Sequence, residues 1–300
     1  MENSPFTKIG QVSAVIKDKE KTIEYYASLG IGPFSPPRQV AKYTEVRGKE
    51  VQLDLKEVMT QMGPIDFEIV PLPEKPSLYH EFHEKRGEGL HHIGFLVEDI
   101  EGAEANLIKQ GFKIIQRGRS EKGGYCYVET DAIGGIIFEL IQRPKDAAPI
   151  AQTKPENTPF AQLATIGVVV QDIERAIDYY QSLGIGPFRP VPMQVTERWF
   201  RGKPADFKSK AMIAKLGEIG FELIQPVVGP SSFTEFLEKK GEGIHHLGFR
   251  TDDLDGEEAK LVKKGVAVRQ KARGENCGFT HFETDHTGGV IFELLKMPPL

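Results

Sequence analysis

The sequence predicts an α+β protein that consists of four βαβββ units arranged in two similar halves. One observation is a long internal repeat, because YYASLGIGPF at 25–34 returns as YYQSLGIGPF at 179–188, 154 residues later. The other is an apolar strand with a central glutamate, which closes each of the four expected units. Similarity at a fixed spacing indicates duplicated structural units, so both halves should share one fold.

The same offset of 154 residues links side chains that can carry chemistry. The linked pairs are Arg47 and Arg201, His92 and His246, Tyr127 and His281, and Glu139 and Glu293. The segment between the two copies contains four prolines, which favours an extended linker. We therefore predict a first domain over residues 1–142, a proline-rich linker over 143–160 and a second domain over 161–300.

Each unit should start with a strand that leads into a helix capped by an aspartate. Asp18 and Asp99 hold this position in the first half, where an aspartate side chain accepts hydrogen bonds from the first helical turn. Gly30 and Gly111 should end these helices, because glycine adopts the left-handed conformation of a helix C-terminus. The other expected elements are strands at 40–47, 51–59 and 65–70 and short connecting helices at 77–86 and 231–240.

The composition excludes several classes of function. A formal net charge of −5 and a pI near 6.0 give no basis for binding nucleic acid or an anionic membrane surface. No apolar run approaches the ~18 residues of a membrane span. The N-terminal residues lack a signal-peptide pattern, and two cysteines cannot form a disulfide framework, so we expect a cytoplasmic protein. We expect a monomer or homodimer that acts on a small molecule.

Glutamates inside apolar strands are the main chemical signal. They are Glu68, Glu139, Glu222 and Glu293, one at the end of each unit. Side chains alternate along a strand, so these carboxylates should point away from the helices, into the space around which each sheet curls. Burying a carboxylate costs several kcal/mol unless it is paired, protonated or bound to a cation. The repetition therefore indicates a shared role in a pocket.

Each half also places a histidine on the pocket face of a first strand, at His92 or His246. If the units of one half pack together, one imidazole meets three oxygen donors, which suits an octahedral divalent cation such as Zn, Ni, Co, Mn, Fe or Mg. The converging residues would be Gln11, Glu68, His92 and Glu139. If the units pair across the halves, the set would instead be Gln11, Glu68, His246 and Glu293.

Three repeated motifs give a family resemblance. They are LGIGPF at 29–34 and 183–188, GEGxHH at 87–92 and 241–246, and GGxIFEL at 134–140 and 288–294. The chain resembles the vicinal oxygen chelate superfamily, which includes glyoxalase I, methylmalonyl-CoA epimerase, extradiol dioxygenases and bleomycin-resistance proteins. The motifs are most similar to the epimerase and glyoxalase branch. The resemblance implies two glyoxalase-like domains, each with curled mixed sheets around a metal site.

The resemblance also implies ligand positions. In the first half they fall on Gln11, Glu68, His92 and Glu139, and in the second half on Thr165, Glu222, His246 and Glu293. Thr165 departs from the pattern, which leaves Glu222, His246 and Glu293 as metal ligands in the second half. A dioxygenase of this family would need a histidine at position 165.

Four further residues are candidates for substrate contact. They are Arg47 and Arg201 in matching turns and Tyr127 and His281 in matching strands. His91 and His245 lie one residue before the candidate ligands, so we expect them to face the other side of the strand and to be structural.

The function that these residues favour is that of a metal-dependent lyase, isomerase or epimerase acting on a small carbonyl or thioester substrate. The metal would act as a Lewis acid, Glu139 would take the proton next to the carbonyl and Glu68 would be its partner on the opposite face. The alternatives are a ligand-sequestering protein of the bleomycin-resistance kind and an extradiol-type dioxygenase with atypical ligands.

Overall fold

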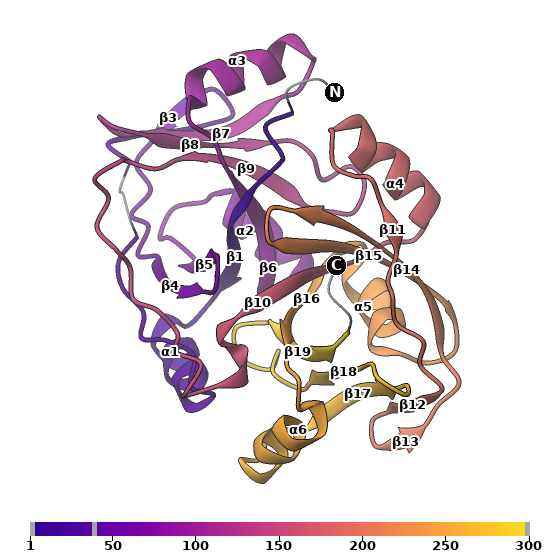
Figure 1. Ribbon diagram of the computed structural model, residues 1–300. Helices are drawn as coiled ribbons and strands as arrows, with labels where there is room; N and C mark the ends of the chain where they lie inside the picture. The colour runs from indigo at the N-terminus through magenta and orange to yellow at the C-terminus, as the bar shows by residue number, and fades with distance from the viewer. Residues whose placement is uncertain (1–3, 38–40, 298–300) are drawn as a thin grey trace.

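The structure, a computed structural model, describes residues 4–37 and 41–297 and confirms the predicted α+β class (Figure 1). The first half contains β1 (Ile9–Ile16), α1 (Lys19–Ser28), β2 (Tyr43–Val46), β3 (Lys49–Val51), β4 (Val58–Met62), β5 (Ile65–Pro71), α2 (Leu78–Arg86), β6 (Gly89–Leu96), α3 (Ile100–Lys109), β7 (Ile114–Arg119), β8 (Gly124–Val128) and β9 (Ile137–Gln142).

The second half repeats this order after a short 3₁₀ turn, Pro159–Ala161. It contains β10 (Leu163–Val169), α4 (Ile173–Ser182), β11 (Arg189–Pro190), β12 (Glu197–Phe200), β13 (Lys203–Pro204), β14 (Lys208–Leu216), β15 (Ile219–Val228), α5 (Ser232–Lys240), β16 (Gly243–Arg250), α6 (Leu254–Lys263), β17 (Val268–Arg273), β18 (Gly278–Phe282) and β19 (Ile291–Lys296).

Each half forms one mixed sheet of its own strands. Among the described residues, the first sheet has the order β3-β2-β7-β8-β9-β6-β1-β5-β4 and the second the order β11-β14-β15-β10-β16-β19-β18-β17-β12-β13. The central pair is antiparallel, β1 with β6 and β10 with β16, and a parallel strand flanks it on each side. The units therefore pair within each half and not across the halves, the two possibilities that the sequence left open.

The segment after the first helix of each half crosses the sheet from one edge to the other. It first pairs beside β4, through Ser35 and Met59, and then enters β2, which pairs with β7 at the opposite edge. In the second half β11 pairs with β14 and β12 with β17 in the same way. Linking both edges of one sheet curls it around a pocket.

The strand predicted at 51–59 is wrong. Strand β3 ends at Val51 and β4 starts at Val58, and the residues between them line the pocket of the first half, among them Leu53 and Leu55. The strand predicted at 40–47 is shorter than expected, Tyr43–Val46, and its first residue, Val40, lies outside the described residues.

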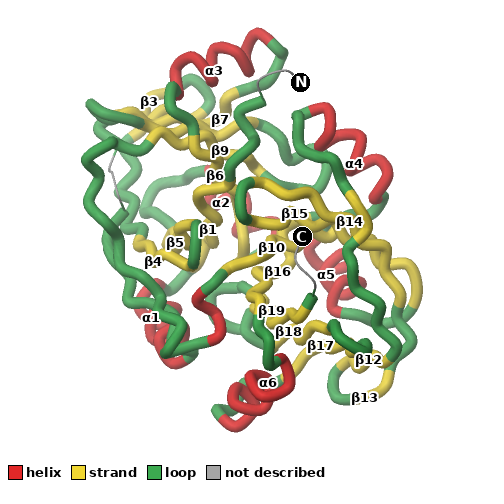
Figure 2. Tube along the Cα trace, in the orientation of Figure 1, coloured by secondary structure: helices red, strands yellow, loops and turns green. Residues whose placement is uncertain are grey.

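The helices begin and end where the sequence indicates. Asp18 accepts a hydrogen bond from the N–H of Lys21, and Asp99 accepts one from the N–H of Gly102, so both cap their helices. Gly30 follows α1 with φ +79°, a left-handed conformation that a side chain would strain. The connecting helices α2 and α5 are present as predicted. Helices α1, α3, α4 and α6 lie on the outside of the two sheets (Figure 2).

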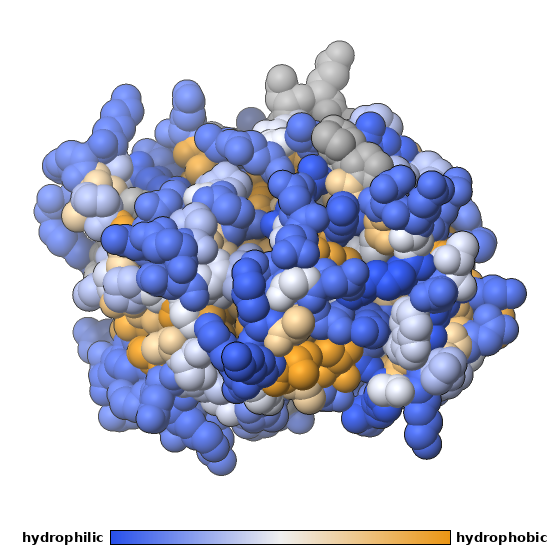
Figure 3. All heavy atoms as spheres, turned by 60° about the horizontal axis from the view of Figure 1, so that its bottom comes forward, coloured by the Kyte–Doolittle hydropathy of each residue, from blue (hydrophilic) through white to orange (hydrophobic). Residues whose placement is uncertain are grey.

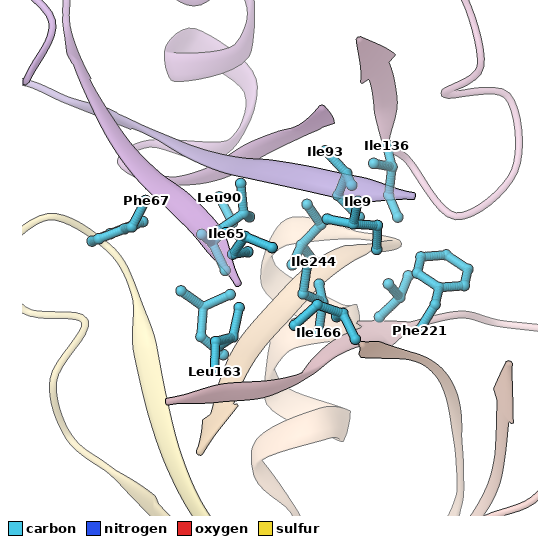
Figure 4. Close-up of a cluster of buried hydrophobic side chains, with 14 of the residues drawn as sticks. Ile9, Ile65, Phe67, Leu90, Ile93, Ile136, Leu163, Ile166, Phe221 and Ile244 are labelled. Carbon is cyan, nitrogen blue, oxygen red and sulfur yellow. The ribbon is translucent and has the colours of Figure 1, made fainter. Parts of the chain in front are cut away.

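The two halves share one hydrophobic core. Figure 4 shows side chains of both sheets, such as Ile93 from the first half and Ile244 from the second, gathered between the strands. The ring of Tyr180 on α4 lies 5.9 Å from that of Phe138 on β9 and 5.0 Å from that of Phe221 on β15. Tyr26 on α1 makes the equivalent contacts with Phe67 and Phe292. Each first helix therefore joins the sheets of both halves.

The segment between the halves packs against the first sheet. Thr153 is fully buried and shares a hydrogen bond with Thr60 on β4 (3.0 Å), and its hydroxyl accepts one from the N–H of Gly32 (2.9 Å). Phe160 is also fully buried, against Phe249 and Phe292 of the second half. The predicted linker thus packs against both halves and contains turns at 145–146 and 155–157, while its bounds at 143 and 160 remain predictions.

The face of the molecule in Figure 3 is mostly polar. Hydrophilic side chains predominate on it and apolar ones form small patches. No helix in the described part of the chain has the length and apolar character that a membrane span requires.

Because the halves share one core, we predict that they unfold cooperatively. Phe138→Ala should lower the free energy of unfolding by about 3–5 kcal/mol, because it leaves a cavity where the halves meet. The only tryptophan, Trp199, lies in the second half, so its fluorescence should report the loss although the substitution is in the first half. Urea unfolding followed by this fluorescence and by circular dichroism measures both.

Ile108→Ala is the control, because that side chain is half exposed and should change stability by no more than about 0.5 kcal/mol. A Trp199 transition that Phe138→Ala leaves unchanged would show that the halves unfold independently.

Candidate metal centres

The strand register brings the predicted ligands of the first half together. Glu68 on β5, Ser13 on β1 and His92 on β6 stand in one row across the sheet. Gln11 on β1, Gly94 on β6 and Glu139 on β9 stand in the next row. The small residues in the middle leave room for the long ones: a Cβ atom at Gly94 would lie 3.0 Å from Glu139 Oε2.

The donor atoms of these residues converge on His92. Its Nε2 atom lies 3.2 Å from Glu139 Oε2 and 3.5 Å from Glu68 Oε2. The amide of Gln11 donates to Glu139 Oε2 (3.3 Å). All four residues are buried. The structure therefore places Gln11, Glu68, His92 and Glu139 within reach of one ion, and their role as ligands remains a proposal.

Two observations indicate that this donor set fits a divalent cation. His92 Nε2 is buried and has no hydrogen-bond partner among the described residues, which is costly for a polar atom. Burial, with the nearby Glu139 and Glu57 carboxyls, raises the pKa of Glu68 well above its usual value, and burial also raises that of Glu139. Two carboxylates that are costly to ionise beside an unpartnered imidazole nitrogen form a centre that a bound cation would stabilise.

The direction expected for the His91 side chain is wrong, because a β-bulge turns it, while its structural role stays a prediction. Ser13 pairs with His92 and the next residue, Ala14, pairs with Leu90, so His91 is an extra residue without a partner in β1. Its ring turns to the side of His92, with the two Nδ1 atoms 2.9 Å apart, and packs against Tyr79 and Phe82.

The same bulge recurs in the second half, where Gly167 pairs with His246 and Val168 with Ile244. His245 is the extra residue there, and its Nδ1 atom lies 3.0 Å from that of His246.

The contact between the two histidines fixes a tautomer. Burial lowers the pKa of His92 to about 3, so its ring is neutral and carries one proton. For Nε2 to bind a cation, that proton must lie on Nδ1, where it is donated to His91 Nδ1. In the second half the relay continues, because His245 Nε2 lies 2.9 Å from Ser232 Oγ. The bulged histidines are therefore suited to orient the candidate ligands.

The second half brings together a different set. His246 Nε2 lies 3.3 Å from Glu293 Oε2 and has no hydrogen-bond partner among the described residues. Glu222 and Glu293 line the same pocket as His246, whose volume is about 600 Å³. Thr165 is buried, but its hydroxyl makes no hydrogen bond within the described part of the chain.

His281 is the addition that distinguishes this half. Its Nε2 atom lies within hydrogen-bond distance of Glu293 Oε1 (3.2 Å), and its ring lies over that of His246, with centroids 4.7 Å apart. Burial by itself would raise the pKa of Glu293, but its attraction to His246 and the hydrogen bond with His281 outweigh burial and lower that pKa to about 2. Burial and the charge of Glu293 raise the pKa of Glu222 to about 7.

Of the predicted substrate contacts, the strand residues lie beside the centres and the arginines do not. Tyr127 is buried next to His92, and its hydroxyl shares a hydrogen bond with that of Tyr79 (2.8 Å). Arg47 and Arg201 stand at exposed turns with φ near +50° and pair with surface carboxylates, Arg47 with Glu81 at 2.7 Å. Neither arginine is among the residues that line the pockets described for the two halves, and each ties its turn to a helix, Arg47 to Glu81 and Arg201 to Glu235. Their assignment to substrate binding remains a prediction.

The described geometry is accompanied by a family match over most of the chain. The profile of the Glyoxalase/Bleomycin resistance protein/Dioxygenase superfamily matches residues 10–128 and again residues 165–281. The chain belongs to this superfamily, and the predicted vicinal oxygen chelate membership is confirmed.

Relatives of known activity fall into two groups. The chain is 27% identical over 199 residues to 4-hydroxyphenylpyruvate dioxygenase of Pseudomonas aeruginosa, a match that covers 62% of this chain and 54% of the relative. It is 25% identical over 180 residues to mitochondrial methylmalonyl-CoA epimerase of Mus musculus, covering 57% of this chain and 90% of the relative. The match thus spans about half the length of the curated dioxygenase.

Solved structures share the two-half fold. A mutant of 4-hydroxymandelate synthase from Streptomyces coelicolor superposes with a TM-score of 0.60 at 14% identity, covering 98% of this chain and 93% of the other. A variant of homoprotocatechuate 2,3-dioxygenase from B. fuscum gives 0.53 at 15% identity, covering 98% and 73%. At these identities the likeness establishes the fold alone.

The raised pKa of Glu139 predicts a stability effect that depends on pH. A carboxyl whose pKa is higher in the folded state adds stability that is present at low pH and lost as the pH rises through that pKa. Metal-free Glu139→Gln, which stays neutral, should therefore match the wild type near pH 4 and exceed its free energy of unfolding at pH 8. Urea unfolding in EDTA at both values measures the difference.

Adding Zn²⁺ or Mn²⁺ should reverse this order, since the wild type gains thermal stability from the ion and the variant gains less. A metal-free variant that is less stable than the wild type at pH 8 would contradict the cost assigned to the buried charge.

The histidine pair predicts an effect on affinity for the ion. His91→Phe removes the acceptor for His92 Nδ1–H and should weaken divalent-cation binding by about 10–100-fold, the usual effect of losing such a partner. His91→Asn keeps an acceptor oxygen near that position and should retain more of the affinity. Competition with a chromophoric chelator measures both, and equal losses in the two variants would show that only packing is affected.

Proposed function

We propose that the protein is a metal-dependent lyase, isomerase or epimerase of the vicinal oxygen chelate type that acts on a small carbonyl or thioester substrate. The observation that carries this proposal is the convergence of two buried carboxylates, Glu68 and Glu139, on His92. They come from β5 and β9, the strands on either side of the central β1–β6 pair. Two carboxyls that approach one point from two sides are suited to move protons at one carbon.

Gln11, Glu68, His92 and Glu139 would hold the cation. When bound, a divalent ion supplies Lewis-acid polarisation of a substrate carbonyl. The first half of the chain supplies the proton chemistry: Glu139 takes the proton from the carbon next to the carbonyl, the electron pair of that bond passes to the carbonyl oxygen, and Glu68 returns a proton. Burial raises the pKa of both carboxyls above that of an exposed glutamate, which makes each a stronger base when it is ionised.

The walls of the first pocket support a small substrate. Tyr79, Tyr125 and Tyr127 line it together with the aliphatic side chains of Leu53 and Ile141. Arg143 also lines it, but its guanidinium donates to Asp66 (2.7 Å). The pocket thus combines aromatic walls with acidic groups, which favours a substrate that is polar at one carbonyl and not strongly anionic there.

An oxygenase centred on the second half is a second candidate. It is supported by the similarity to the dioxygenase of Pseudomonas aeruginosa and by two imidazoles, His246 and His281, that both contact the carboxylate of Glu293. Two histidines and one carboxylate are the donor composition of non-haem iron oxygenases. A sequestering protein is disfavoured, because binding by shape alone gives no reason for buried carboxylates.

Proton exchange at a carbonyl-adjacent carbon is the direct test. The metal-loaded protein in D₂O should introduce deuterium into members of a panel of α-branched acyl thioesters and α-hydroxy carbonyl compounds, followed by mass spectrometry. Glu139→Gln and Glu68→Gln should each lower the exchange rate by about 10²–10⁴-fold, the usual effect of losing a general acid or base.

Glu81→Gln, which changes an exposed carboxylate that pairs with Arg47, is the matched control and should leave the rate unchanged. Oxygen uptake with Fe²⁺ but no deuterium incorporation would contradict the proton-transfer function and favour the oxygenase. Tight ligand binding without either reaction would favour sequestration.

A further inference from the structure

We propose that His281 is a metal ligand of the second half, so that His246, His281 and Glu293 form a nitrogen-rich centre that differs in kind from that of the first half. This inference concerns the second pocket alone and does not depend on the proton transfer proposed for Glu68 and Glu139. The family positions provide only Glu222, His246 and Glu293 there, because Thr165 interrupts the pattern.

The two halves differ in the side chain that contacts the equivalent carboxylate. In the first half the amide of Gln11 on β1 donates to Glu139 Oε2 (3.3 Å). In the second half the hydroxyl of Thr165 on β10 makes no hydrogen bond among the described residues. The contact to Glu293 comes instead from His281 on β18, at 3.2 Å. The contact that Gln11 makes with the carboxylate in the first half is thus replaced by one from His281 in the second half.

Two neighbouring residues beside the centre differ together between the halves. In the first half Tyr79 on α2 and Tyr127 on β8 share a hydrogen bond between their hydroxyls (2.8 Å), so the polar atom of Tyr127 is engaged by Tyr79. The equivalent residues are Phe233 on α5 and His281, whose rings meet edge to face at 5.2 Å. Phe233 has no polar atom that could form a hydrogen bond with His281, so the imidazole of His281 is available to contact Glu293.

The distances from both imidazoles to Glu293 match those between neighbouring ligands of one ion. Ligands bound side by side to an ion with metal–donor distances of about 2.0–2.2 Å lie roughly 3 Å apart. His246 Nε2 and His281 Nε2 lie 3.3 and 3.2 Å from the two oxygens of Glu293. His246 Nε2 is buried and without a hydrogen-bond partner in the described part of the chain. Both imidazoles therefore meet the same carboxylate at the spacing of neighbouring metal ligands.

His245 stands close to this set but is assigned a different role. One nitrogen from each of His245, His246 and His281 lies within 4.8 Å of the other two. Yet His245 Nδ1 faces His246 Nδ1, and its other nitrogen lies 2.9 Å from Ser232 Oγ. Both of its nitrogens are therefore occupied, and His245 positions His246 without binding the ion.

The donor sets give the two halves different metal preferences. Imidazole suits Zn, Cu, Ni and Fe, whereas carboxylate and carbonyl oxygens suit Mg and Mn. The first half offers one imidazole and three oxygen donors, and the second offers two imidazoles with one carboxylate. We expect the second pocket to select the imidazole-preferring ions when both are free to bind.

Counting the bound imidazoles tests the proposal without measuring activity. In the full chain with Glu68→Gln and Glu139→Gln, which weaken the first centre, one equivalent of Cu²⁺ should give the pulsed electron paramagnetic resonance pattern of two bound imidazoles. Adding His281→Tyr, the residue of the first half, should reduce the pattern to one imidazole and weaken Zn²⁺ binding at least tenfold. His281→Gln is a second, smaller change with the same expected result if the tyrosine variant does not fold.

Tyr127→Phe is the matched control at the equivalent position of the first half and should leave the two-imidazole pattern intact. A pattern of one imidazole before any change at His281, or of two imidazoles that persist in both His281 variants, would overturn the proposal. A loss of Zn²⁺ affinity without a change in the count would do so as well, because His281 would then only orient Glu293.

Discussion

The structure depends on one electrostatic constraint, the burial of carboxylates beside an imidazole within an otherwise apolar sheet. Glu68 and Glu139 lie within 3.5 Å of His92 Nε2, in a pocket where ionising them is costly without a cation. The surrounding fold is arranged around this site. Ser13 and Gly94 leave space between the ligand rows, and a crossing segment links the edges of the sheet so that it curls around the donors.

Duplication of the scaffold has allowed the two pockets to diverge without loss of the fold. The sheets keep the same central strand order, the same bulge before the candidate ligand and the same contacts from the first helices. The chemistry on that frame differs: Gln11 and Tyr127 of the first half correspond to Thr165 and His281 of the second. Since Phe138 and Tyr180 join both halves in one core, one pocket can change while the other preserves the shared framework.

The sequence predicted the fold and the convergence of the donors because both follow from local rules. The repeat gave the halves, the alternation of strand side chains gave the direction of Glu68 and Glu139, and Asp18 marked a helix start. Three features escaped it because they arise from strand pairing. A bulge turned His91 toward His92, the residues between β3 and β4 lined the pocket instead of continuing a strand over 51–59, and His281 met Glu293 across β18 and β19. The equivalence of Tyr127 and His281 was the one available signal.

Anomalous X-ray diffraction from crystals grown with Zn²⁺ or Mn²⁺ tests the central claim most directly. The account predicts a peak in the first pocket about 2.0–2.3 Å from His92 Nε2 and from oxygens of Glu68 and Glu139. Fully occupied crystals with no anomalous peak between these side chains, or with the carboxylates turned away from His92, would contradict it.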